Sequence, residues 1–122
     1  MTAYPTVLKS DLQLPTAGFM VHVVQLEFSD HLVILISRNG RIGDIVLSQK
    51  NTLPSINDRT SQDIDARTIF GPEKVNSCLI TQYITKSLNT SKTILVSTDF
   101  KEDICFSDTQ IICDCLKNIQ TA

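Results

Sequence analysis

Few residues of this chain have the chemistry for catalysis, and their spacing does not favour an active site. The two histidines, His22 and His31, lie within or at the start of segments with strand character. No G-x-S-x-G nucleophile motif, no H-E-x-x-H zinc motif and no suitably spaced pair of carboxylates accompanies either histidine. We therefore predict two structural histidines, no catalytic residues and a protein that is not an enzyme.

The four cysteines do not have metal-ligand spacing. They are Cys78, Cys105, Cys113 and Cys115, with no C-x-x-C pair among them. Cys113 and Cys115 fall in an expected helix, where residues two apart point about 200° away from one another and cannot hold one ion. We predict reduced, partly buried thiols that act as small apolar side chains, and no metal or other cofactor.

The acidic residues Asp99, Glu102 and Asp103 could in principle bind a cation, but their place between an expected strand and an expected helix favours a solvated corner. The 11 basic and 13 acidic residues give a net charge of −2, which argues against a nucleic-acid partner. No apolar run reaches the roughly 18 residues needed to span a bilayer, and no secretory signal begins the chain. These features predict a protein of the cytoplasm or nucleus.

The elements that would carry these residues form a strand-rich pattern in a single domain of residues 1–122. Asn39-Gly40 has the positive-φ residue types of a tight turn, and predicts that residues 31–36 and 45–48 pair as a hairpin. With residues 20–28 they would form an antiparallel meander. Further strands are expected at 4–14, 64–70 and 93–97. The fold class is therefore α+β, an antiparallel sheet of about six strands with two helices on one face.

Both expected helices have apolar stripes that should face the sheet. The first begins at Gly71-Pro72-Glu73 and the second follows Ser107. Ser77 is expected on the solvated side of the first helix. The apolar positions are Val75, Cys78, Leu79, Ile80, Tyr83, Ile84 and Leu88 in the first helix, and Ile111, Ile112, Cys115, Leu116 and Ile119 in the second.

The strand at residues 32–36 is apolar on both faces, because successive side chains of a strand alternate sides. In a chain of 122 residues the helices can cover only one face of the sheet. The other face would remain an exposed apolar patch. We therefore expect dimerisation through the sheet, with a second copy or with a sister chain.

Residues 49–63 are almost all polar or turn-forming and predict a long mobile loop of the kind that often binds partners. Arg38, Arg41 and Lys50 are expected to form a small basic cluster at one end of the hairpin, where they could meet an acidic surface.

Two blocks of the sequence resemble the proteasome assembly chaperone 3 family. The first is Phe28-Ser29-Asp30-His31 with its apolar strand, followed by Gly40-Arg41-Ile42-Gly43. The second runs from Ile69-Phe70-Gly71 through the helix to Thr93-Ile94-Leu95-Val96. The blocks, with the variable loop between them, match the family's strand, turn and helix order.

The resemblance implies a chaperone that promotes assembly of the α-ring of the 20S proteasome. Family members pair through their sheets with a sister subunit similar to proteasome assembly chaperone 4, and bind α subunits. For the dimer interface we predict Val33, Leu35, Val46 and Leu95, or the opposite face with Leu32, Ile34 and Ile36. For the α-subunit contact we predict Arg38, Arg41, Lys50, Asn57, Asp58 and Arg59.

A small dimeric regulatory scaffold of the roadblock or longin kind is the main alternative. Such modules usually place a helix before the central hairpin. Here the strands come first, which favours the chaperone.

Overall fold

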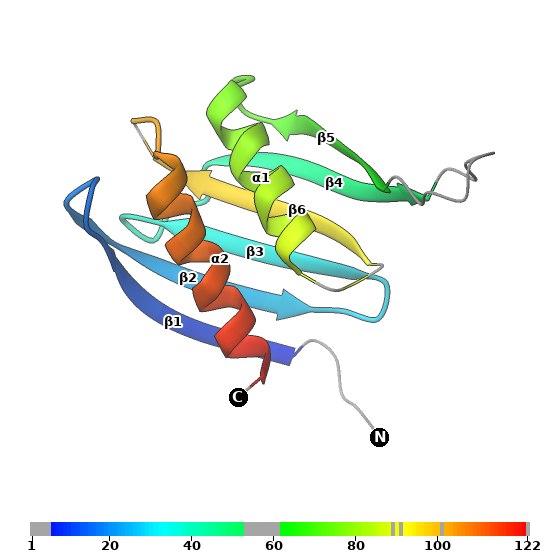
Figure 1. The fold of residues 1–122 in the computed structure, drawn as a ribbon, viewed down its shortest axis with the longest axis horizontal. Coiled ribbons are helices and arrows are strands. Elements are labelled where there is room, and N and C mark those ends of the chain that lie inside the picture. The colour runs from blue at the N-terminus through cyan, green and yellow to red at the C-terminus, as the bar shows by residue number, and fades with distance from the viewer. Residues whose placement is uncertain (1–5, 53–61, 89, 91, 101, 122) are drawn as a thin grey trace.

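The computed structural model describes residues 6–52, 62–88, 90, 92–100 and 102–121, with residues 50–52, 62–63 and 119–121 described by their backbone alone. Six strands and two helices form two layers, with both helices on one face of the sheet (Figure 1). The elements are β1 (Thr6–Leu14), β2 (Phe19–Glu27), β3 (His31–Ser37), β4 (Asp44–Thr52), β5 (Gln62–Phe70), α1 (Val75–Ser87), β6 (Thr93–Asp99) and α2 (Phe106–Thr121). The predicted α+β class is confirmed.

The sheet is mixed, and its order is β1-β2-β3-β6-β4-β5. β6 lies between β3 and β4, parallel to the first and antiparallel to the second. The predicted hairpin of residues 31–36 with 45–48 is therefore wrong. Asn39-Gly40 does form a turn with positive φ at Gly40, but the chain then crosses the end of β6 before it re-enters the sheet.

Gly43 makes this crossing possible. Its backbone N–H donates to Oγ of Ser97 at 3.0 Å, so the backbones of this segment and β6 lie in close contact. A Cβ at Gly43 would overlap the carbonyl oxygen of Thr98 and lie 2.8 Å from the carbonyl carbon. The glycine thus permits a close approach of the two backbones.

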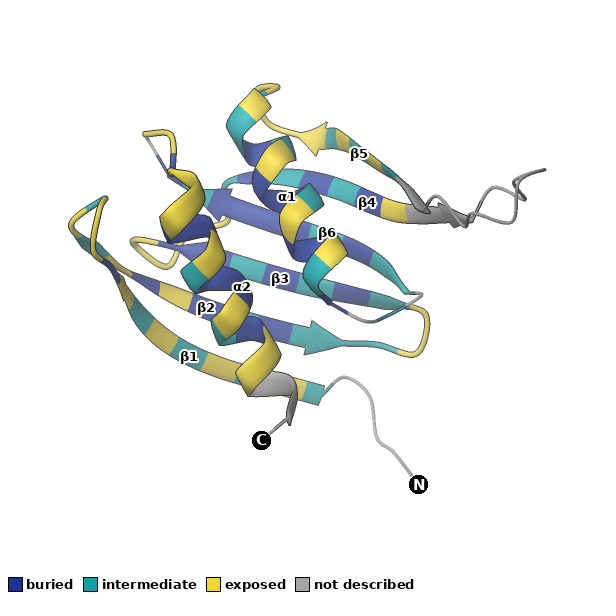
Figure 2. Ribbon diagram, viewed as in Figure 1, coloured by how far each residue is buried: buried dark blue, intermediate teal, exposed yellow. Residues whose placement is uncertain are grey.

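The hydrophobic core lies between the sheet and the helices. Leu32, Ile34 and Ile36 of β3 are at most 1% exposed and belong to one cluster with apolar residues of both helices. Ile94 and Val96 of β6 lie in the same cluster. Figure 2 shows this buried band along the central strands beneath the helices.

Helix α1 packs on the sheet through hydroxyl groups as well as aliphatic side chains. The buried residues of this helix are Ser77, Ile80, Thr81, Ile84 and Thr85. Thr85 Oγ1 donates to Ser48 Oγ of β4 at 2.7 Å, and the hydroxyls of Ser77 and Thr98 are 3.2 Å apart. Because these hydroxyls are hydrogen-bonded, their burial leaves no polar group unsatisfied at this contact.

This contact turns three predicted core residues outward. Val75, Leu79 and Tyr83 are 78%, 44% and 40% exposed, whereas Ser77, which was expected on the solvated side, is buried. The prediction for Ile80, Ile84 and Leu88 is confirmed. The hydropathy pattern predicted the wrong rotation of α1 about its axis. It treats serine and threonine as solvated, whereas here their hydroxyls bond to side chains of the sheet.

Helix α2 covers the half of the sheet that contains β1. Ile112 and Leu116 are fully buried, and Ile111 and Cys115 are half-buried. At the start of α2, the carboxylate of Asp108 accepts hydrogen bonds from the backbone N–H groups of Thr16 and Ala17 at 3.3 and 2.8 Å. This buried carboxylate ties the helix to the β1–β2 turn.

Candidate protein-binding surface

The face of the sheet that points away from the helices carries a continuous group of aliphatic side chains. Residues paired across neighbouring strands share a face, and Val33 lies opposite Leu26 on β2 and opposite Leu95 on β6. Leu95 in turn lies opposite Leu47 on β4. The half-buried members of this group, which we call the open face, are Val24, Leu26, Val33, Leu35, Ile45, Leu47 and Leu95.

Within the described part of the chain, neither helix packs on the open face. Helix α1 contacts β4, β5, β6 and α2, while α2 contacts β1 and α1, all from the other side of the sheet. Among the residues that the structure describes, these seven are shielded by neighbouring side chains on the same face alone. A row of partly exposed aliphatic residues on adjacent strands is typical of a surface that binds another protein.

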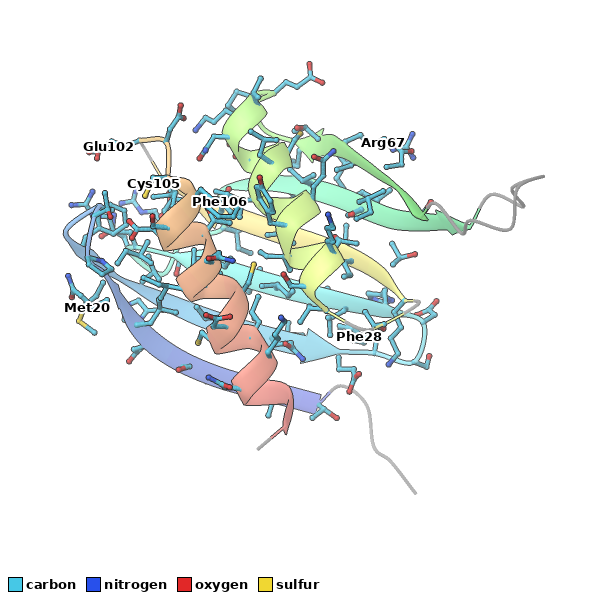
Figure 3. All side chains as sticks on the ribbon, in the orientation of Figure 1. Met20, Phe28, Arg67, Glu102, Cys105 and Phe106 are labelled. Atoms are coloured by element: carbon cyan, nitrogen blue, oxygen red, sulfur yellow. The ribbon has the colours of Figure 1, made fainter. Side chains whose placement is uncertain are left out.

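Polar and charged side chains border the open face on both outer strands. On β1 and β2, Asp11 Oδ1 lies 2.6 Å from His22 Nδ1, beside the exposed Lys9. On β5, Asp65 and Arg67 are exposed, and Figure 3 labels Arg67 on this strand. An aliphatic centre with a polar rim is the usual composition of a protein–protein interface.

The open face is large enough for a stable interface. Its central strands β3 and β6 are each seven residues long. With six strands about 4.8 Å apart and a rise of about 3.3 Å per residue, the whole side of the sheet that contains the open face covers on the order of 600 Å². Standard interfaces bury about 600–1,000 Å² per partner, so an interface over this side of the sheet would be at the lower end of the standard size.

Three of the four predicted interface residues lie together on the open face, and one does not. Val33, Leu35 and Leu95 share this face, whereas Val46 lies opposite Val96 and is fully buried beneath the helices. Placing Val46 with the others was wrong, because β4 pairs with β6 in a register that turns Val46 inward. The alternative set of Leu32, Ile34 and Ile36 is in the core.

Four open-face residues were absent from that prediction, namely Val24, Leu26, Ile45 and Leu47. The alternation of apolar and polar residues along 20–28 already placed Val24 and Leu26 on one side of their strand. Which side of the sheet this was depends on the pairing of β2 with β3, in which Val24 lies opposite Leu35. The sequence therefore shows that Val24 and Leu26 share a side of their strand, but the pairing of β2 with β3 is needed to show that this side is the open face.

The residues predicted to contact α subunits do not form one basic cluster. Arg38 and Arg41 are exposed on the segment between β3 and β4. Lys50 is near the other end of β4, six residues beyond Asp44 and therefore about 20 Å from that segment. The predicted cluster is wrong because a strand separates its members. Asn57, Asp58 and Arg59 lie outside the described residues.

Much of the segment predicted as a long loop belongs to strands. β4 continues to Thr52 and β5 begins at Gln62, so residues 49–52 and 62–63 are part of the sheet. The remaining residues, 53–61, lie outside the described part of the chain.

Arg38 has a defined place against the rest of the fold. Its guanidinium carbon lies 4.3 Å from the centre of the Phe19 ring, and the Phe19 ring packs 6.0 Å from that of Phe100. Cation–π contact holds this charge over the start of β2. Arg41 carries the second positive charge of the same segment.

His31, Asp30 and Cys113 are titratable groups whose neighbours in the fold are defined. His31 stacks on Phe28 with ring centres 4.5 Å apart, and its Nδ1 lies 2.6 Å from Asp30 Oδ1. The hydrogen bond with His31 lowers the pKa of the exposed Asp30 carboxyl. Burial raises the pKa of the Cys113 thiol.

No three possible metal ligands come together among the residues the structure describes, and no described helix is long and apolar enough to cross a membrane.

Among known proteins, this chain is similar to solved structures. No protein-family model and no curated protein sequence matches this chain. A chain in the crystal structure of a chaperone complex for yeast 20S proteasome assembly has a TM-score of 0.74 to this one. This chain has the same fold. The match covers 93% of this chain and 98% of the yeast chain at 16% identity, so the likeness to the yeast chaperone extends over the whole two-layer architecture.

Proposed function

We propose that this chain is a chaperone that promotes assembly of the 20S proteasome α-ring and acts as a single domain without catalytic activity. The observation that supports the proposal most directly is the open face, seven half-buried aliphatic residues with a polar rim on a fold shared with a yeast proteasome assembly chaperone complex. A sheet face of this kind is suited to a permanent protein partner rather than to a substrate.

The partner on the open face would be a sister subunit similar to proteasome assembly chaperone 4, or a second copy of the chain. Two such sheets packed face to face would bury Val33, Leu35 and Leu95 between them, with the helices on the outside of the pair. The aliphatic centre would then lose its contact with water, and the flanking charges would remain at the solvated rim.

The α-subunit contact would use other parts of the molecule. Arg38 and Arg41 form an exposed basic corner beyond the end of β3, which could meet acidic side chains of an α subunit. Lys50, near the other end of β4, would form a second contact with the α subunit together with Asn57, Asp58 and Arg59. The pair would hold α subunits in order during ring assembly in the cytoplasm or nucleus.

The proposal is tested by tagging the chain in its own cells, purifying it under mild conditions and identifying the bound proteins by mass spectrometry. We expect proteasome α subunits and a small sister chain, with little mature β subunit. Membrane-trafficking or GTPase-regulating proteins without proteasome subunits would instead support a roadblock or longin-like scaffold and contradict the chaperone.

A pair of variants separates the open face from the rest of the molecule. Val33→Asp combined with Leu35→Asp should release the sister chain, because an unpaired charge would be buried in the interface. Gln110→Asp introduces the same charge at an exposed position of helix α2 and should retain the sister chain. Equal recovery of the sister chain with both variants would reject this face as the interface.

A further inference from the structure

The outer side of helix α1 carries an apolar stripe that the fold does not use. Val75, Leu79 and Tyr83 follow one another at intervals of four residues and are all exposed. Phe106 at the start of α2, 55% exposed, extends the stripe, because its ring packs edge-on against that of Tyr83 with centres 5.0 Å apart (Figure 3). This stripe lies on the helix layer, away from the open face.

Hollows along this side of α1 form a groove next to strand β5. One hollow of about 340 Å³ is lined by Ile64 of β5 and by Leu79, Gln82, Tyr83 and Lys86 of α1. A second, of about 380 Å³, continues toward the start of the helix and shares Leu79 and Gln82 with the first. We call these adjoining hollows the α1–β5 groove. Each has room for more than one aliphatic side chain.

The groove runs beside an unpaired strand edge. β5 is the last strand of the sheet, and its only strand neighbour in the described sheet is β4. Every second residue of such an edge presents its backbone N–H and C=O outward, ready to pair with another strand. A strand added here would direct alternate side chains up beside Ile64 into the α1–β5 groove.

The charge of the groove favours an acidic partner at one end. Lys86 lines the first hollow, is exposed and has no ion pair among the described residues. Lys74, near the other end, is already engaged, since its Nζ lies 3.3 Å from the buried carboxylate of Asp44. The available positive charge is therefore at the end of the groove where α1 finishes.

We propose that the α1–β5 groove binds an extended segment of a partner protein. The segment adds as a strand to the edge of β5, places apolar side chains against Ile64, Leu79 and Tyr83, and directs an acidic side chain toward Lys86. This site goes beyond the sheet-to-sheet pairing proposed above, because it lies on the opposite layer and binds whether or not the open face is covered.

The test uses a synthetic peptide of alternating valine and threonine, with glutamate at one end and the same length as the nine-residue β5. The isotope-labelled full chain is titrated with this peptide, and binding is followed by amide chemical shifts. We expect shifts confined to β5 and α1. Methylating every second backbone nitrogen of the peptide, on the edge that pairs, should abolish binding, because it removes the hydrogen-bond donors and keeps the side chains.

Variants of the chain assign the side-chain contacts. Leu79→Ser should weaken binding about tenfold through lost apolar contact. Lys86→Glu should weaken binding of this peptide about fivefold and restore it for a peptide with lysine in place of glutamate. Ile42→Ser, which changes an exposed aliphatic residue outside the groove, is the matched control and should leave binding unchanged.

Three results would overturn the proposal. They are no shifts at millimolar peptide, equal binding of the methylated peptide, and shifts that Leu79→Ser leaves intact. A fourth result would also overturn it: the chain associates with itself through Leu79 and does not bind the peptide. The groove would then bind a second copy of the chain instead of a segment of a different protein. None of these outcomes depends on the partner of the open face, so the two proposals can fail independently.

Discussion

Single residues decide how the chain passes from β3 to β4 in this fold. Gly43 is in contact with the backbone of β6, and its N–H is bonded to Ser97, so the segment after β3 can cross the end of β6 and leave room for that strand in the middle of the sheet. A residue with a side chain at this position would push the two backbones apart. The order of the central strands thus depends on the absence of one Cβ.

Replacing Gly43 with alanine should lower the free energy of unfolding by about 2 kcal/mol or more, because the neighbouring atoms are backbone and cannot move aside. Urea unfolding of the purified chain measures the loss. Gly40→Ala is the control. Its Cβ would meet nothing within 4 Å, so only the positive φ of 74° should cost stability, about 1 kcal/mol. A smaller loss for Gly43→Ala than for Gly40→Ala would contradict the crossing.

The cysteines should differ in reactivity according to their burial. Burial raises the pKa of the Cys113 thiol above its ordinary value of 9.0, so near pH 8 this group stays protonated. Cys105 is exposed. With iodoacetamide near pH 8, mass spectrometry should show alkylation of Cys105 first and of Cys113 only after unfolding, because the thiolate is the reactive form. Early modification of Cys113 in the folded protein would contradict its place in the core.

At the scale of elements, helix α1 shows what a hydropathy pattern can and cannot predict. The pattern identified the helix and placed Ile80, Ile84 and Leu88 in the core. It did not reveal that Ser77, Thr81 and Thr85 would be buried too, because these residues count as polar. The hydroxyls of Ser77 and Thr85 find partners on β4 and β6, and the Thr81 hydroxyl donates to the Ser77 carbonyl within the helix. The partners come from strands distant in the sequence, so the orientation of α1 is set by tertiary contacts.

The hydroxyl contact between α1 and β4 can be measured by substitution. Thr85→Val keeps the shape of the side chain but removes its hydrogen bonds with Ser48 Oγ and the Thr81 carbonyl. It leaves the fully buried Ser48 hydroxyl without that partner, and should cost about 1–3 kcal/mol in urea unfolding. Adding Ser48→Ala removes the unsatisfied group and should recover part of that loss. Thr81→Val is the control. It removes only a second hydrogen bond to the Ser77 carbonyl and should cost less. Additive losses in the double variant would contradict direct coupling.

The strands themselves were largely predictable, but their neighbours were not. Alternating and apolar segments located all six strands. The turn at Asn39-Gly40 predicts a hairpin, since strands that are neighbours in sequence usually pair. Insertion of β6 depends on contacts between residues about 50 to 60 positions apart, such as Val33 with Leu95. No local pattern carries that information, and the error in the face of Val46 follows from the same cause.

At the scale of the whole molecule, the two faces of the sheet differ in what covers them. The helices cover one face of the sheet and complete the core, and the other face stays aliphatic at its centre. The sequence already indicated this from one strand, residues 32–36, whose side chains are apolar on both sides. The part of the chain that the structure describes forms two layers and leaves the open face uncovered, which is why we propose that a second chain binds there.

Covering the open face should make the thermal stability of the purified chain depend on its concentration. A partner that binds only the folded state stabilises it by mass action, so pairing of two copies should raise Tm by about 5–10 °C across a hundredfold increase in concentration. Differential scanning calorimetry measures the shift. Leu35→Asp should lower Tm and remove its concentration dependence, because the buried charge prevents pairing. Gln110→Asp, at an exposed position of helix α2, should preserve the concentration dependence. A wild-type Tm independent of concentration, together with a monomer mass in sedimentation, would show that the chain does not pair with itself and that the open face needs a different chain.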